Sequence, residues 1–136
     1  MKLEIDHIAI AVENLESAVD RWLTLTGAIL VRREYVAAQD TEVAFLSLGG
    51  SRIELIAPAS QGSVVSRFLE KRGPGLHHLA LKASDGQEVL NCMADRGARL
   101  IDEQLRPGAE ESLVGFVHPT AFGGVLVEIV EHPNHS

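Results

Sequence analysis

The sequence has few of the features that mark secreted, membrane-spanning or nucleic-acid-binding proteins. Its one cysteine, Cys92, cannot form a disulfide within the chain, so we expect a reducing, cytoplasmic environment. Residues 1–6 lack the basic start and apolar run of a secretion signal. No stretch approaches the roughly eighteen consecutive apolar residues of a membrane span. Twelve basic side chains face nineteen acidic ones, and the net charge of -7 disfavours nucleic acid as a partner.

One pattern occurs twice in this chain, whose 136 residues and 46% apolar composition suit one domain with a buried core. Residues 6–10 (DHIAI) correspond to residues 77–81 (HHLAL), and residues 52–56 (RIELI) correspond to residues 126–130 (LVEIV). A Gly-Ala pair lies between the two segments of each copy. From histidine to glutamate the spacing is 47 residues in the first copy and 50 in the second. A longer hairpin loop at residues 118–124 accounts for the difference.

Each copy is expected to fold as a βαβββ unit. The first segment alternates between two faces, with His7 on one and Ile8 on the other, which is the period of a strand. Apolar residues at helical spacing then predict a helix after each first strand. The first helix begins after Asn14 and ends at Gly27, and the second begins with the capping pair Asp85 and Glu88 and ends at Gly97. Three strands follow in each copy, those of the first at residues 29–35, 42–48 and 51–57.

These elements predict an α+β fold and one domain spanning residues 1–136. The first repeat covers about residues 1–60, a linking helix about residues 62–73, and the second repeat about residues 75–132.

Four residues are predicted to bind a metal ion. His7 and His78 occupy the same position in the two copies, and so do Glu54 and Glu128. If the two units pack with approximate twofold symmetry, the four side chains converge on one point of a concave sheet. Two imidazoles and two carboxylates suit one divalent ion such as Co, Ni, Mn, Zn or Mg, with positions left open for water or substrate.

Taken singly, each of these residues has a plainer explanation, because a lone histidine is usually a hydrogen-bonded core residue and a strand glutamate usually faces solvent. Glu128, however, lies among apolar residues from Val125 to Val130, and a buried carboxylate without a partner is costly. The other histidines fit a metal site less well. They are His77, which points away from His78, His118 at a hairpin or pocket rim, and His132 and His135 in the C-terminal tail.

Several motifs resemble those of the methylmalonyl-CoA epimerases in the vicinal oxygen chelate superfamily, which also includes glyoxalase I, extradiol dioxygenases and antibiotic-resistance proteins. The resemblance covers nearly the whole chain. The motifs are residues 6–12 (DHIAIAV), 54–58 (ELIAP), 68–80 (FLEKRGPGLHHLA), 116–119 (FVHP) and 124–128 (GVLVE). The resemblance implies one vicinal-oxygen-chelate domain with a cupped mixed sheet. It also implies that the metal ligands are His7, Glu54, His78 and Glu128, with cobalt the preferred ion.

The reaction implied by the resemblance is epimerisation at the carbon between a thioester and a carboxylate, as in (R)- and (S)-methylmalonyl-CoA. A metal stabilises the enolate, and bases on its two faces exchange the proton. Glu128 is the first candidate for such a base and Glu54 the second. Many family members carry acids near residues 37–38, which are alanines here, so Asp40 and Glu42 remain as weaker candidates. By analogy, the protein is expected to be a homodimer.

Other functions stay open at this stage. Thr120-Ala121-Phe122 stand where epimerases commonly have a lysine, and the remaining basic residues near the expected pocket are Lys71, Arg72 and Arg106. A glyoxalase I-type lactoylglutathione lyase or related isomerase would use the same metal. A metal-free binding protein, as in antibiotic resistance, would need only an apolar cup. An extradiol dioxygenase fits less well, because a three-ligand facial triad does not need a second glutamate.

Overall fold

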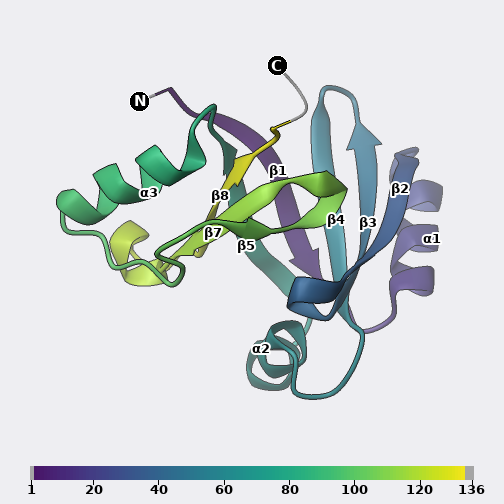
Figure 1. Ribbon diagram of the computed structural model, residues 1–136. Helices are drawn as coiled ribbons and strands as arrows, with labels where there is room; N and C mark the ends of the chain where they lie inside the picture. The colour runs from purple at the N-terminus through teal and green to yellow at the C-terminus, as the bar shows by residue number, and fades with distance from the viewer. Residues whose placement is uncertain (1, 134–136) are drawn as a thin grey trace. The chain divides into compact units, whose positions relative to one another are not determined.

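The computed structural model describes residues 2–133 and is drawn in Figure 1. The described strands are β1 (Glu4–Ala11), β2 (Ile29–Val36), β3 (Thr41–Leu48), β4 (Ser51–Pro58), β5 (Gly75–Lys82), β6 (Arg106–Pro107), β7 (Leu113–Val117) and β8 (Val127–Glu131). The helices are α1 (Leu15–Thr26), α2 (Val64–Arg72) and α3 (Gly86–Asp95), with short 3-10 turns η1 (Ala37–Gln39), η2 (Ala109–Glu111) and η3 (Pro119–Phe122). The predicted α+β fold with two βαβββ repeats is confirmed.

The chain forms two compact units. One comprises residues 7–77, and the other comprises the residues from 78 onward together with the first six. Each unit contains most of one repeat, so the units follow the internal repetition of the sequence closely. The prediction of one domain over residues 1–136 stays a prediction.

In the unit of residues 7–77 the strand order is β2-β3-β4-β1, with β1 parallel to β4 and the other neighbours antiparallel. The Gly49-Gly50 turn joins β3 to β4, and the φ of 62° at Gly49 suits glycine. Helix α1 packs against β3 and β4 (Figure 1). The buried side chains between them are Leu15, Val19, Ala28, Ala44, Leu46, Leu55 and Ala57.

The predicted ends of α1 are confirmed. The Asn14 side chain accepts a hydrogen bond from the Ser17 amide at 2.9 Å, as an N-cap residue should. Gly27 ends the helix at φ 74°, where its amide donates to the Leu23 carbonyl. The Ile8 side chain is 39% exposed, whereas Ile10 packs against the α1 core, so the apolar face of β1 covers the helix only in part.

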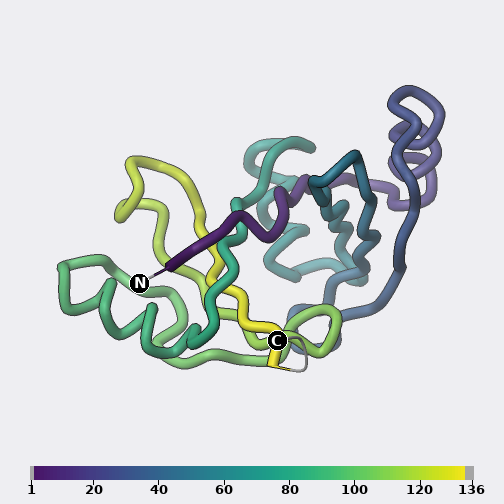
Figure 2. Tube along the Cα trace, turned by 90° about the horizontal axis from the view of Figure 1, so that it is seen from above, coloured from purple at the N-terminus to yellow at the C-terminus, as the bar shows by residue number. Residues whose placement is uncertain are grey.

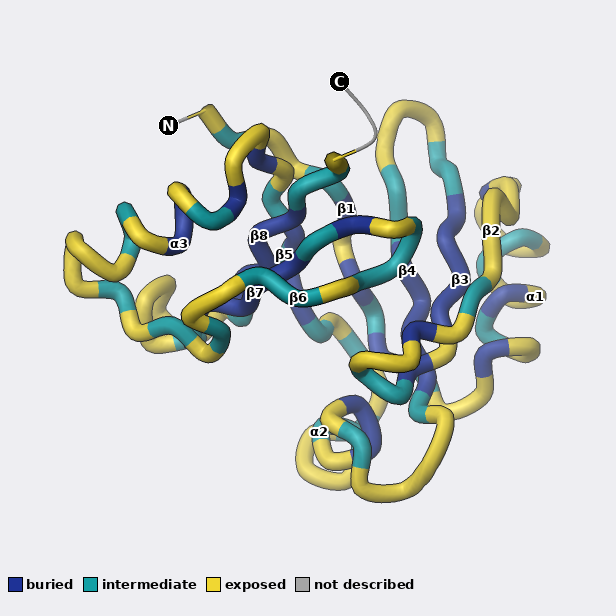
Figure 3. Tube along the Cα trace, viewed as in Figure 1, coloured by how far each residue is buried: buried dark blue, intermediate teal, exposed yellow. Residues whose placement is uncertain are grey.

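In the second unit β5 runs parallel to β8, and β7 is antiparallel to β8. Helix α3 packs against β7 and β8, and the dark-blue positions along it in Figure 3 mark its buried side. Asp85 caps α3 by accepting from the Glu88 amide at 3.1 Å. The helix ends at Asp95, two residues before the predicted turn at Gly97, whose φ is 96°.

The first strand after α3 is much shorter than its counterpart β2. Strand β6 has only two residues and pairs Arg106 with Val114. Pro107 has no amide hydrogen to donate to the ladder, and on the N-terminal side of β6 the chain pairs with β7 again at the isolated bridge between Leu100 and Val117. The second repeat therefore has the three predicted strands after its helix, but the first of these, β6, is only two residues long.

Helix α2 follows β4 in the chain, and Figure 2 traces this teal segment from the strand into the helix. Ser63 caps it by accepting from the Ser66 amide at 3.2 Å, and the helix begins two residues after and ends one residue before the predicted linking helix. Among the described residues, no helix combines the length and apolarity that a membrane span needs.

Candidate metal centre

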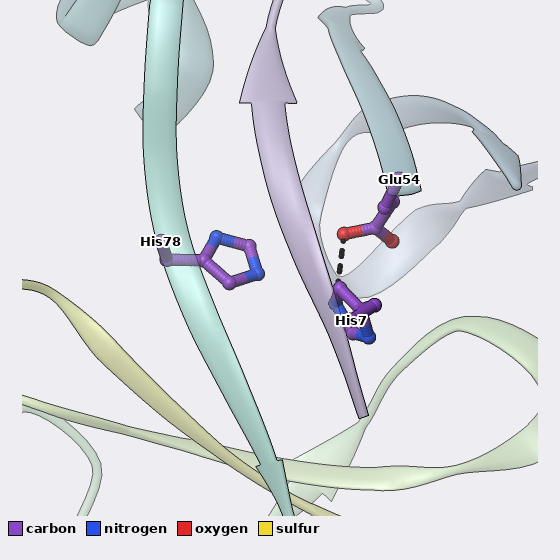
Figure 4. Close-up of side chains that lie close together, drawn as sticks. All are labelled: His7, Glu54 and His78. Carbon is purple, nitrogen blue, oxygen red and sulfur yellow. Dashed lines mark ion pairs between the residues drawn. The ribbon is translucent and has the colours of Figure 1, made fainter. Parts of the chain in front are cut away.

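His7 and Glu54 form a buried pair in the unit of residues 7–77. Strand β1 carries His7 and the neighbouring strand β4 carries Glu54, and Nε2 of His7 lies 3.2 Å from Oε1 of Glu54 (Figure 4). The two side chains are only 5% and 8% exposed. The pairing places Ala9 opposite Glu54, and because His7 and Ala9 share a face, the imidazole and carboxylate point to the same side.

The second unit contains an equivalent pair. Nε2 of His78 on β5 lies 3.2 Å from Oε1 of Glu128 on β8, and these side chains are 4% and 6% exposed. The register places Ala80 opposite Glu128, as Ala9 lies opposite Glu54. The structure thus joins each predicted histidine to the predicted glutamate of its own repeat. It also confirms that residues 127–130 are buried, whereas Val125 is 48% exposed and was wrongly expected to be buried.

Each pair is supported by a phenylalanine. The Phe45 ring meets His7 edge-on, with ring centroids 5.6 Å apart, and Phe116 meets His78 in the same way at 5.2 Å. Phe45 lies opposite Glu54 in the β3–β4 ladder, and Phe116 lies opposite Glu128 in the β7–β8 ladder.

An arginine lies over each of these rings. The Arg52 guanidinium is 4.4 Å from the Phe45 centroid, and that of Arg106 is 6.0 Å from the Phe116 centroid. Neither the two phenylalanines nor Arg52 was predicted from the sequence as part of the site. The signal that could have found the rings is the recurrence of one aromatic residue type before the glutamate of each repeat.

The donor atoms of each pair fit a divalent metal ion. Metal–ligand distances are about 2.0–2.2 Å for imidazole nitrogen and carboxylate oxygen, so neighbouring ligand atoms around one ion lie about 3 Å apart. The nitrogen and oxygen in both pairs are 3.2 Å apart and buried. Imidazole and carboxylate together suit ions from Mg to Co, Ni and Zn, rather than the soft ions that prefer thiolate.

Asp40, a weaker candidate for a catalytic base, is held in a hydrogen-bonded cluster. Ser60 Oγ donates to one of its carboxylate oxygens and Tyr35 Oη donates to the other at 2.8 Å. These hydrogen bonds, that of Ser60 first, hold the pKa of Asp40 below its ordinary value of 3.8. The same hydrogen bond between Tyr35 and Asp40 raises the pKa of Tyr35 above its ordinary value of 10.0. The lowered pKa makes Asp40 a weak base, and Glu42, the other candidate, is exposed on β3.

The remaining histidines lie outside the two pairs. His77 packs edge-on against Phe68 at 4.7 Å, and His118 accepts from the Thr120 amide in the β7–β8 hairpin, as expected of a hairpin residue. His132, which was expected to lie in the C-terminal tail without a partner, is instead anchored to the first strand, because its Nε2 lies 2.8 Å from Oδ1 of Asp6. The two residues are 126 positions apart, too far for a local pattern to link them. His135 lies outside the described residues.

The basic residues predicted near a pocket edge differ in their surroundings. Lys71 and Arg72 are exposed in the last turn of α2. Arg106 is partly buried, with its Nε 3.3 Å from Asp102. The uncharged loop of Thr120, Ala121 and Phe122 is exposed in η3.

Comparison with known families identifies the class of protein. The model of the Glyoxalase/Bleomycin resistance protein/Dioxygenase superfamily matches residues 6–116. The chain therefore belongs to this superfamily, and the two βαβββ repeats with their His–Glu pairs are consistent with its vicinal oxygen chelate fold.

Several similar proteins within the superfamily are methylmalonyl-CoA epimerases. The crystal structure of that enzyme from Mycobacterium tuberculosis is 39% identical, with a TM-score of 0.88 over 93% of this chain and 86% of that one. A variant of the Streptomyces coelicolor enzyme in complex with 2-nitronate-propionyl-CoA is 31% identical, with a TM-score of 0.88 over 93% and 95% of the two chains. The uncharacterized protein YqjC of Bacillus subtilis (strain 168) is 38% identical over 93% and 91% of the two chains. The present chain is an enzyme of the racemase and epimerase class.

Proposed function

We propose that this protein is a metal-dependent epimerase that interconverts (R)- and (S)-methylmalonyl-CoA. The observation that carries the proposal is the pair of equivalent, buried His–Glu couples in a chain related to methylmalonyl-CoA epimerases. A buried imidazole next to a buried carboxylate supplies the nitrogen and oxygen donors that a hard or borderline divalent ion needs.

In this proposal His7, Glu54, His78 and Glu128 together hold one divalent ion, with cobalt preferred and Ni, Mn, Zn or Mg as other candidates. A bound cation stabilises the negative charge that develops on the thioester and carboxylate oxygens when the proton leaves. The Phe45 and Phe116 rings keep the two imidazoles in place by edge contacts. Low exposure of all four ligand side chains limits competition from water.

Glu128 and Glu54 are the proposed catalytic bases. Each carboxylate has two oxygens with about four acceptor positions, so binding an ion through one oxygen leaves capacity to accept a proton. One carboxylate removes the α-proton, and the other residue, which starts in its protonated carboxylic acid form, donates its own proton to the opposite face of the planar enolate, which inverts the configuration. Asp40 is unsuited to this task because its pKa is lowered by Ser60 and Tyr35.

The main rival is a glyoxalase I-type isomerase acting on a thiol adduct of an α-keto aldehyde, which would use the same ligand types. A metal-free binding protein is the rival from another class. The repetition of a His–Glu couple in both units favours a metal-using enzyme over that binding protein, because such a protein needs no ligand-competent residues.

We also propose that the protein is cytoplasmic, that it forms a homodimer, and that its small-molecule partner is an acyl-CoA. Strand β2 lies at the end of the strand order in its unit and exposes Ile29 and Val31, which offers apolar surface to a second copy. Light scattering of the purified protein tests this proposal, because a dimer has twice the molar mass of one chain.

The experiment that tests the function compares two substrates with one metal-loaded preparation. One epimer of methylmalonyl-CoA is incubated with the protein, and formation of the other is followed by chromatographic separation of the intact thioesters, which are diastereomers because CoA is itself chiral. In parallel, the hemithioacetal of methylglyoxal and glutathione is supplied, and formation of the thioester is followed by absorbance. Conversion of the acyl-CoA alone supports the proposal, conversion of the hemithioacetal alone supports the rival, and a Glu128→Gln variant controls for contaminating enzymes.

A further inference from the structure

Strand β7 is held at Phe116 by the side chain and backbone of Asp102. The Phe116 amide donates to Oδ2 of Asp102 at 2.9 Å. The Phe116 carbonyl accepts from the amides of Ile101 and Asp102, at 2.9 and 3.1 Å. Both backbone groups of Phe116 on this edge are therefore bound by residues 101–102, which belong to no strand. We call this arrangement the Asp102 clamp.

Arg106 completes the clamp. Its Nε lies 3.3 Å from Oδ1 of Asp102, so one carboxylate oxygen faces the guanidinium while the other accepts from the Phe116 amide. The guanidinium also lies over the Phe116 ring, 6.0 Å from its centroid. Arg106 thus fixes the Asp102 carboxylate and contacts the face of the same ring whose backbone that carboxylate binds.

Phe116 connects the clamp to the His78–Glu128 pair. Its ring meets the His78 imidazole nearly at right angles, with an interplanar angle of 86° and centroids 5.2 Å apart. Its backbone lies opposite Glu128 in the β7–β8 ladder. A shift of Phe116 would therefore disturb both the imidazole and the carboxylate of this pair.

In the first repeat, the equivalent phenylalanine is held by a full strand. Phe45, the counterpart of Phe116, pairs with Arg32 in the long antiparallel ladder between β2 and β3. In the second repeat the corresponding strand, β6, has only two residues and pairs with Val114 and Leu113, not with Phe116. At Phe116, the residue that contacts His78, the Asp102 carboxylate and the backbone amides of residues 101 and 102 take the place of a continuous strand, next to the isolated bridge between Leu100 and Val117.

We propose that Asp102, anchored by Arg106, is a positioning residue that holds Phe116 so that His78 and Glu128 keep their geometry for metal binding. The inference rests on the proposed function, since it assumes that this pair binds the ion. It predicts that changes at Asp102 alter metal affinity and turnover while the binding of the acyl-CoA changes little.

The test uses four variants of the full-length protein. Asp102→Ala removes the acceptor for the Phe116 amide, and Asp102→Asn keeps an acceptor oxygen but removes the charge that pairs with Arg106. Arg106→Gln removes the guanidinium, and Glu103→Ala is the matched control, since Glu103 is the exposed acidic neighbour of Asp102. Affinity for Co²⁺ is measured by calorimetric titration of the metal-free proteins, and kcat and KM are measured with methylmalonyl-CoA.

We expect Asp102→Ala to weaken Co²⁺ binding about tenfold and to lower kcat by a similar factor, with KM within about twofold of the wild-type value. Asp102→Asn should lose less than Asp102→Ala, Arg106→Gln should resemble Asp102→Asn, and Glu103→Ala should match the wild type. Thermal unfolding of each variant separates positioning from stability. Reduced stability with wild-type Co²⁺ affinity and kcat would overturn the inference.

A further readout distinguishes failure of the inference from failure of the proposed function. The ¹⁵N chemical shifts of the His78 imidazole are recorded in the metal-free proteins. If the wild type binds no Co²⁺ or does not epimerise the substrate, the proposed function fails, yet the clamp is still supported if the His78 shifts change in Asp102→Ala and not in Glu103→Ala. Unchanged His78 shifts in Asp102→Ala would contradict the clamp whatever the activity.

Discussion

A glutamate buried against a histidine has a different energetic status from the same pair at the surface. A surface pair contributes about 0–1 kcal/mol, whereas a carboxylate side chain at 6 or 8% exposure has lost most of its hydration. Glu54 and Glu128 lie in this second situation, each 3.2 Å from an imidazole nitrogen. Such residues are retained more readily for a ligand than for stability, which is why we assign them to metal binding and proton transfer.

The first prediction concerns Glu128. Glu128→Gln keeps the size of the side chain but removes the charge, so bound metal should fall at least about tenfold and kcat more than about a hundredfold. Metal content by mass spectrometry and epimerase rate measure the two effects. Glu42→Gln, at an exposed position of β3, should leave both unchanged. A Glu128→Gln enzyme with full metal and full activity would remove Glu128 from the proposed site.

A second prediction concerns the hydrogen bonds of Asp40. Because its folded-state pKa is lowered, Asp40 adds stability at pH values above its unfolded pKa, and this stability is lost as the pH falls through the folded pKa. Asp40→Asn should therefore lower the urea midpoint at pH 6, with the difference shrinking as the pH falls below 3.8 and through the lowered folded-state pKa. Urea unfolding at several pH values measures this, and a difference that grows on acidification would contradict the assignment.

For Tyr35, in the same cluster, the dependence of stability on pH is opposite to that of Asp40. Its folded-state pKa is raised by the hydrogen bond to Asp40, so its contribution is present below its unfolded pKa and is lost as the pH rises through the folded pKa. Tyr35→Phe should therefore differ from the wild type at neutral pH and converge with it well above pH 10, as read from urea midpoints. A difference that persists undiminished at strongly alkaline pH would show that the hydroxyl does not act through this hydrogen bond.

At the level of elements, much of the architecture follows from local signals in the sequence. Asn14, Gly27 and Asp85 lie where helix ends require a cap or a left-handed residue, so α1 and the start of α3 were predictable from them. The equivalent positions in the two repeats also pointed to the four residues that form the two buried His–Glu pairs.

What could not be predicted depends on contacts distant in sequence or lacking a pattern. The bond from the Phe116 amide to Asp102 spans 14 residues, and no repeat marks Asp102 because the first copy uses a strand instead. The hairpin between β6 and β7 contains two glutamates with positive φ, Glu110 and Glu111, a conformation that residue preference does not predict for glutamate.

The packing of α3 on β7 gives a prediction at this scale. A Cβ built on Gly115 would lie 2.7 Å from Cδ1 of Leu90 and 3.3 Å from Cδ2 of Leu105. Leu90 is fully buried and has little room to move, so Gly115→Ala should destabilise the fold by about 1–3 kcal/mol. Gly50→Ala is the control, because a Cβ there meets nothing within 4 Å. Equal urea midpoints for the two variants would show that α3 moves away from β7 without a loss of stability.

At the scale of the whole molecule, net charge affects the rate at which the proposed substrate associates with the protein. The chain carries a net charge of -7, and an acyl-CoA is also an anion, so their long-range interaction is repulsive. Salt screens this repulsion, with a Debye length of about 8 Å at 0.15 M, so kcat/KM should rise as NaCl increases from about 20 to 150 mM. Initial rates at low substrate concentration measure the effect. A fall in kcat/KM would instead show that a local basic surface guides the substrate.

The central claim, metal-assisted removal of an α-proton, is tested most directly by proton exchange. Racemic methylmalonyl-CoA is added to the protein in D2O with and without EDTA, and loss of the α-proton signal is followed by NMR, with His78→Ala as the control variant. We predict rapid exchange that EDTA abolishes and that the variant lacks. Failure of the fully metal-loaded wild-type protein to exchange the proton, or undiminished exchange in EDTA or in His78→Ala, would contradict the claim.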